Sequence, residues 1–169
     1  HYGFGGILNF ASGKWVQIYR KAGTHGQFNG AELRARDSYD QGANWTNDRL
    51  IYSEATNDAR PDAPRIMGNN RGGFFVNRQA AAGGTAQFPL FIKTDDEGLT
   101  FTLTTVQTDS IAYTFQGHSG LMNYPASQGG HDVLGFISFG FVAAGGLGAL
   151  ATSDNGETWD IITNVANYQ

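Results

Sequence analysis

Short runs in which hydrophobic and polar residues alternate follow one another along the chain, a pattern typical of β-strands that bury one face. Clusters of Gly, Asn, Asp and Ser separate the runs and indicate tight turns. The runs fall into three groups. The first group is 6–10, 14–21, 31–37 and 50–53, the second is 65–68, 73–78, 88–93 and 102–106, and the third is 120–124, 133–139, 149–153 and 160–165. The pattern predicts an all-β chain.

The composition agrees with this prediction and excludes several classes of protein. The 24 glycines among 169 residues and the 13% of aromatic residues favour short strands and tight turns over a helical bundle. Because cysteine is absent, disulfides and thiolate metal sites are excluded. Glycines and a serine interrupt the most apolar stretch, 133–151, so we expect no membrane span. A net charge of -4 gives no basic footprint for nucleic acid.

An eight-residue pattern, Ser/Thr-x-Asp-x-Gly-x-(Thr/Asn)-aromatic, occurs three times. Its aspartates, Asp40, Asp96 and Asp154, lie 56 and 58 residues apart, which indicates a structural repeat. In each octet we expect the aspartate to accept hydrogen bonds from the turn backbone, the glycine to adopt a positive φ and the aromatic ring to pack on the hairpin. The residues given these structural roles are Ser38, Asp40, Gly42, Trp45, Thr94, Asp96, Gly98, Phe101, Thr152, Asp154, Gly156 and Trp159.

The octets resemble the Asp boxes, or BNR repeats, of the sialidase superfamily, and the resemblance is greatest to phage endosialidase, tailspike and tail-fibre proteins. It implies a β-propeller of sialidase type with three four-stranded blades, covering 1–57, 58–112 and 113–169. Three blades are half of the six that are usual in this superfamily. We therefore expect the remaining blades to come from a longer chain, of which this sequence is a piece, or from a second copy.

Two arginines are the first candidates for ligand binding. Arg20 and Arg78 are predicted to end the second strand of successive blades, 20 and 18 residues before the box aspartates, at the end opposite the boxes. Two guanidinium groups can hold one carboxylate, and the resemblance implies that the carboxylate belongs to sialic acid. The alternative is a pair of exposed strand-end arginines, each paired with an Asp or Glu.

The segment between the first two blades is the candidate source of a catalytic carboxylate. Asp58, Arg60, Asp62 and Arg65 alternate there around two prolines, and we expect a loop crossing between blades. Asp62 is the predicted acid or base and Arg60 a predicted ligand contact, although glycoside hydrolysis needs two carboxylates. A solvated, salt-bridged linker is the alternative. The resemblance also implies a Glu with a Tyr nucleophile, and no Glu in the sequence fits upstream of Arg20 or Arg78.

The remaining candidates lie in loops at the same predicted end. His25 and Gln27 follow Arg20, and His118 opens the third blade, so each could donate a hydrogen bond to a sugar hydroxyl. The histidines have no metal-ligand spacing, and we expect neither a metal nor a cofactor.

These features support two functional hypotheses. The first is recognition, and possible cleavage, of an acidic or sialylated cell-surface polysaccharide by a phage-type tail protein, outside the cell or on the virion surface and trimeric in that setting. Cleavage would depend on a catalytic carboxylate outside this stretch. The second is a catalytically inactive propeller that acts as a structural or protein-binding scaffold, because fold alone does not decide function.

Overall fold

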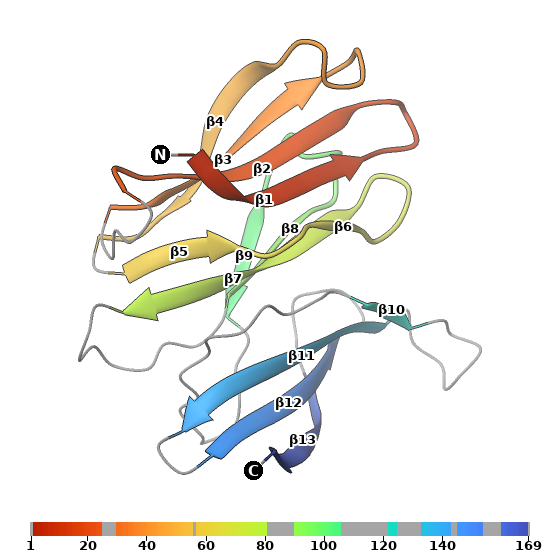
Figure 1. Cartoon of the computed structure of the whole chain (residues 1–169). Helices are drawn as coiled ribbons and strands as arrows, with labels where there is room; N and C mark the ends of the chain where they lie inside the picture. Colours follow the sequence, from red (N-terminus) through yellow and green to blue (C-terminus); the bar gives the residue numbers. More distant parts are fainter. Residues whose placement is uncertain are drawn as a thin grey trace.

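The computed structural model describes residues 2–24, 30–55, 57–80, 90–105, 122–124, 133–142, 145–153 and 160–168. These residues form three antiparallel sheets, which follow one another from the N-terminus to the C-terminus (Figure 1). The described residues contain no helix, and therefore none that could cross a membrane. The prediction of an all-β chain is confirmed, with four strands in two of the sheets and five in the other.

Sheet one contains β1 (Tyr2–Asn9), β2 (Trp15–Lys21), β3 (Glu32–Ser38) and β4 (Thr46–Ser53), hydrogen-bonded in that order. Its strands are connected as an antiparallel meander, so the start of β1, the end of β2, the start of β3 and the end of β4 lie together. We call this the upper end of the sheet.

Sheet two is built in the same way. Its main path is β5 (Asn57–Pro61), β7 (Gly72–Ala80), β8 (Leu90–Thr94) and β9 (Thr102–Thr105), and the short β6 (Arg65–Ile66) pairs with the beginning of β7. Sheet three contains β10 (Met122–Tyr124), β11 (Val133–Val142), β12 (Gly145–Ser153) and β13 (Asp160–Tyr168).

Strand β5 corrects the sequence prediction for this region. The residues from Asn57 to Pro61 were expected in a loop, whereas they form the edge strand of sheet two. A polar segment can be a strand here because Asp58 is fully buried in ion pairs. An edge strand also tolerates Pro61, which has no N–H to donate.

The core lies between sheets one and two. Alternate residues of β2 and β3, including Val16, Ile18 and Leu33, face alternate residues of sheet two, including Phe74 and Ile92. All five side chains are at most 1% exposed. Burial of apolar side chains of this size is worth roughly 1.5–3 kcal/mol each, so this interface holds the first two sheets together.

The first two octets have the predicted hairpin geometry. In the first, Asp40 Oδ1 accepts the Asn44 N–H at 2.8 Å, and in the second Asp96 Oδ1 accepts the Thr100 N–H at 2.8 Å. Gly42 has a φ of 88°, and Gly98 has a φ of 77°. Ser38 and Thr94, at the first position of each octet, bind the aspartate and the turn backbone with their hydroxyl groups.

The aromatic residues that end these two octets have different neighbours. Phe101 packs against the core between the sheets, whereas Trp45 lies against Arg36 of its own sheet. In the third octet Thr152 lies in β12, and Asp154, Gly156 and Trp159 lie outside the described residues.

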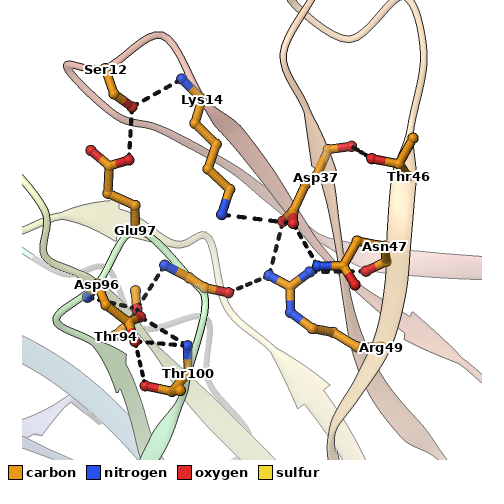
Figure 2. Close-up of polar contacts among 11 residues, drawn as sticks. Ser12, Lys14, Asp37, Thr46, Asn47, Arg49, Thr94, Asp96, Glu97 and Thr100 are labelled. Atoms are coloured by element: carbon orange, nitrogen blue, oxygen red, sulfur yellow. Dashed lines mark hydrogen bonds and ion pairs between the residues drawn. The ribbon is translucent and has the colours of Figure 1, made fainter.

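A polar contact joins the lower end of sheet one to the second octet (Figure 2). The buried carboxylate of Asp37 pairs with Lys14 at 3.7 Å and with Arg49 at 2.9 Å. Arg49 also donates a hydrogen bond to the Gly98 carbonyl, and Ser12 donates one to Glu97 at 2.8 Å. Arg49 therefore links the two sheets at the end where the octets lie.

Candidate functional site

The upper end of the first two sheets carries a group of charged and polar side chains, which we call the strand-end cluster. Its members come from β2, β4, β5, β7 and the segment between β4 and β5. They are Arg20, Tyr52, Glu54, Asn57, Asp58, Arg60 and Arg78.

One half of the cluster is centred on Asp58. Arg20 Nε lies 2.7 Å from Asp58 Oδ1, and Arg60 Nε lies 2.7 Å from Asp58 Oδ2, so one carboxylate accepts hydrogen bonds from two guanidinium groups. Arg20 also donates a hydrogen bond to the Thr24 carbonyl at 3.3 Å. The side chains of Arg20 and Asp58 are 0% exposed, whereas that of Arg60 is 25% exposed. Arg20 therefore fixes the carboxylate, and Arg60 is the arginine that solvent can reach.

The other half is centred on Glu54, a residue that the sequence analysis did not select. Its carboxylate accepts hydrogen bonds from Tyr52 Oη, Asn57 Nδ2 and Arg78 Nε. The side chain of Glu54 is 7% exposed and that of Arg78 is 21% exposed. Burial and the hydrogen bond to Glu54 raise the pKa of Tyr52 above its ordinary value, against an opposing effect of Arg78. Tyr52 is therefore a protonated donor at neutral pH.

The contact between Arg78 and Glu54 was not foreseen from the sequence. The two residues are 24 positions apart in the sequence, and the end of β4 brings Glu54 to the end of β7. The signal available in the sequence was the Tyr52-Ser53-Glu54 segment at the end of a predicted strand, next to the start of the following blade.

Arg20 and Arg78 do not occupy equivalent positions in their sheets. The first residue of each octet pairs with a residue of the second long strand of its sheet. Ser38 pairs with Trp15 in sheet one, and Thr94 pairs with Gly72 in sheet two. Arg20 therefore lies five residues after Trp15 in β2, whereas Arg78 lies six residues after Gly72 in β7. Because side chains alternate along a strand, this offset turns Arg20 to the face of its sheet that packs on sheet two, and Arg78 to the face that packs on sheet one.

The two arginines thus point into the same interface from opposite sides, although different carboxylates hold them. The cluster contains three guanidinium groups and two carboxylates, so it has an excess of positive charge. This excess, with the partial exposure of Arg60 and Arg78, suits the binding of an anion.

Asp62 lies two residues after Arg60 in the sequence, next to this cluster. It follows β5, and its backbone N–H donates a hydrogen bond to the Phe75 carbonyl at 2.9 Å. Four residues of strand, roughly 13 Å, separate it from Asp58. The candidate ligand contacts His25, Gln27 and His118 lie outside the described residues.

The described residues contain no group of three or more His, Cys, Asp or Glu side chains arranged to hold a metal ion. In this part of the chain, the polar chemistry of the upper end is that of guanidinium, carboxylate, phenol and amide groups.

Comparison with known proteins finds similarity at the level of structure. No protein-family model and no curated protein matches the sequence. The chain is similar to the Hadza microbial sialidase Hz136, with a TM-score of 0.69, 14% identity, and coverage of 98% of this chain and 38% of that one. It is also similar to an N-acetylgalactosamine deacetylase from F. plautii solved with blood group B trisaccharide, with a TM-score of 0.64, 16% identity, and coverage of 100% and 54%.

A third similar structure is the leech intramolecular trans-sialidase, with a TM-score of 0.58, 19% identity, and coverage of 80% of this chain and 19% of that one. The chain therefore spans about half or less of the length of each of these structures. At this level of identity the likeness concerns the fold, and this chain has the fold of a sialidase-type β-propeller.

Proposed function

We propose that this chain recognises an acidic glycan at the upper end of its first two sheets. The observation that carries the proposal is the excess of guanidinium groups in the strand-end cluster, two of which are partly exposed. A sugar carboxylate would accept hydrogen bonds from the partly exposed guanidinium groups of Arg60 and Arg78. Arg20 would act as a positioning residue, since it holds Asp58 and Asp58 holds Arg60.

The names of the similar structures support a carbohydrate ligand. Two of them are named as a sialidase and a trans-sialidase, and a third was solved with a trisaccharide. We propose further that the acidic glycan belongs to a cell surface and that the chain is part of a phage-type tail protein on the virion surface. Further blades would complete the propeller, and the tail protein would be a trimer. The composition, rich in Gly, Asn, Thr and aromatic residues, and the absence of cysteine support this more specific role.

Binding to polysialic acid, hyaluronan and polygalacturonate tests the recognition step, with carboxyl-reduced forms of each polymer as neutral controls. We expect the parent chain to bind at least one acidic polymer and to lose that binding on carboxyl reduction. Arg60→Gln and Arg78→Gln should each weaken binding by about 10- to 150-fold, which corresponds to one charge-assisted hydrogen bond.

Arg65→Gln is the matched control, because Arg65 is exposed and lies in β6 near the opposite end of sheet two. Binding that survives carboxyl reduction, or that is equal in the three arginine variants, would contradict the proposal.

Cleavage is the further part of the same proposal. The carboxylates that this chain offers for it are Asp62 and Glu54, the latter hydrogen-bonded to Tyr52. The test is hydrolysis of the bound polymer by the parent chain and by Asp62→Asn, Glu54→Gln and Tyr52→Phe. Products from the parent chain that are lost in one of these variants support cleavage, and a parent chain that binds without forming products contradicts cleavage by these residues alone.

The complete burial of Arg20 and Asp58 favours a second candidate function, an inactive propeller that serves as a scaffold. A buried, fully paired carboxylate is typical of a structural ion pair, and it contributes nothing to acid–base chemistry. Failure of every acidic polymer to bind would make this the better proposal.

A further inference from the structure

Glu54 is the residue at which four segments of the upper end meet. It lies between β4 and β5, and its backbone carbonyl accepts the Gly30 N–H at 3.0 Å. Its carboxylate accepts hydrogen bonds from Tyr52 of β4, Asn57 of β5 and Arg78 of β7. Three strands and the segment before β3 therefore hold this one residue.

The three donors are divided between the two oxygens of this carboxylate. Oε1 accepts hydrogen bonds from Tyr52 Oη and Arg78 Nε, and Oε2 accepts one from Asn57 Nδ2. The side chain of Glu54 is 7% exposed, so water hardly competes for these oxygens. The donors come from different strands and bind both oxygens, so they fix the orientation of the carboxylate.

Two of these donors are neutral, which distinguishes this half of the strand-end cluster from the half centred on Asp58. The Asp58 carboxylate accepts hydrogen bonds from two guanidinium groups. At Glu54, Arg78 already balances the charge of the carboxylate. The hydrogen bonds from Tyr52 and Asn57 therefore add direction to the carboxylate without adding charge.

The direction of Arg78 depends in turn on this carboxylate. The residue that pairs with Arg78 on β5 is Ala59, whose side chain has no polar group to hold a guanidinium. Among the described residues, Glu54 is the carboxylate that pairs with Arg78. The side chain of Arg78 is 21% exposed, so a ligand can reach it. An arginine that is already held loses less conformational entropy when a ligand binds.

We infer that Tyr52 and Asn57 are positioning residues for recognition of the ligand. They orient Glu54, and Glu54 orients Arg78 toward the carboxylate of an acidic glycan. This inference rests on the function proposed above, and it gives both residues a role in recognition that needs no contact with the ligand. Loss of either neutral donor is therefore expected to weaken binding only through Arg78.

A double-mutant cycle on the binding of the same acidic polymers tests this dependence. We expect Tyr52→Phe, which removes only the donating hydroxyl, to weaken binding by roughly 2- to 13-fold, the equivalent of one hydrogen bond. In the Arg78→Gln chain the same substitution should have no further effect. In the Arg60→Gln chain it should keep its full effect. Asn57→Ala should show the same dependence on Arg78.

Tyr19→Phe is the matched control for Tyr52→Phe. Tyr19 Oη also donates a hydrogen bond to a carboxylate, that of Asp48 at 2.7 Å, and neither residue belongs to the strand-end cluster. Its affinity for the polymers should equal that of the parent chain. Urea unfolding of each variant verifies that every affinity is measured on folded protein.

The Arg78 Nε–H signal in NMR spectra gives a second measurement, which needs no ligand. Its exchange with solvent should be faster in Tyr52→Phe and in Asn57→Ala than in the parent chain, and unchanged in Tyr19→Phe. Equal exchange in all four chains would overturn the inference, because Glu54 would then hold Arg78 without help from the neutral donors.

The binding cycle can also overturn the inference. Equal losses on Tyr52→Phe in the Arg60→Gln and Arg78→Gln chains would mean that the phenol acts on binding without Arg78. Unchanged affinity in both Tyr52→Phe and Asn57→Ala would have the same consequence. In these cases recognition itself would stand, whereas a parent chain that binds none of the polymers contradicts the proposed function and this inference together.

Discussion

Arg20 and Asp58 form a completely buried ion pair across the interface between the first two sheets, with Nε and Oδ1 separated by 2.7 Å. They are 38 positions apart in the sequence, so this contact exists only in the folded chain. A buried pair of this kind is costly to break, because the remaining charge loses its counter-charge at a position that water does not reach.

Asp58→Asn is expected to destabilise the fold by about 3–5 kcal/mol, since it leaves the buried Arg20 without its counter-charge. Urea unfolding followed by tryptophan fluorescence measures the change. The control is Asp48→Asn, which removes a carboxylate that is 51% exposed and should cost at most about 1 kcal/mol. Equal stability of the two variants would show that the Arg20–Asp58 pair contributes little.

Arg49 is expected to be important for stability although it lies at the end of the sheets opposite the strand-end cluster. It pairs with the buried Asp37, donates to the Gly98 carbonyl and lies 5.8 Å from the Phe101 ring centroid. Arg49→Ala should cost on the order of 1–3 kcal/mol, because Asp37 and the carbonyl lose a donor. Thermal or urea unfolding measures this cost, and acidic-polymer binding by the folded fraction should not change. A variant as stable as the parent chain would contradict the proposed link between the sheets.

The first octet predicts a specific pH dependence. Hydrogen bonds from the Asn44 backbone, the Asn44 side chain and the Ser38 hydroxyl lower the pKa of Asp40 to about 2. In the unfolded chain this carboxyl has a pKa near the ordinary aspartate value of 3.8 and binds the proton more readily. The contribution of Asp40 to stability is therefore present above that pH and is lost as the pH falls toward 2. Carboxyl NMR titration measures the pKa, and Asn44→Ala should raise it. A carboxyl that titrates near 4 in the folded chain would contradict the turn geometry.

The octets could be predicted from the sequence because their hydrogen bonds are local. Asp40 and Asp96 each bind the backbone four residues ahead, so eight residues contain the whole structure. The strand-end cluster could not be predicted in this way. Asp58 is compatible with a strand only because Arg20 is beside it, and Glu54 is recognised only through Arg78, 24 residues later. These contacts depend on how two sheets pack.

The positions of the two candidate arginines within their strands could not be predicted for a similar reason. Their distances from the box aspartates, 20 and 18 residues, led to the expectation that Arg20 and Arg78 occupy equivalent strand ends in successive blades. The strand pairing instead places them five and six positions along β2 and β7, and this single offset reverses the face. Register is decided by pairing between strands, which the spacing along one strand does not contain.

Gly5 provides a test of the register shift in the pairing of β1 with β2, which lies between Gly3 and Gly5, and Gly13 is its matched control. Both glycines have a positive φ, 113° for Gly5 and 88° for Gly13, so alanine is strained at either position. At Gly13 a Cβ atom would have no neighbour within 4 Å, whereas at Gly5 it would lie 2.1 Å from the Ile18 carbonyl oxygen. Gly13→Ala should therefore cost about 1–2 kcal/mol from backbone strain alone, and Gly5→Ala should cost clearly more because β1 must separate from β2. Urea unfolding gives both values, and hydrogen exchange at Tyr19 reports the β1–β2 pairing. If the two variants were equally stable and Tyr19 stayed protected, the close approach at Gly5 would be absent in solution.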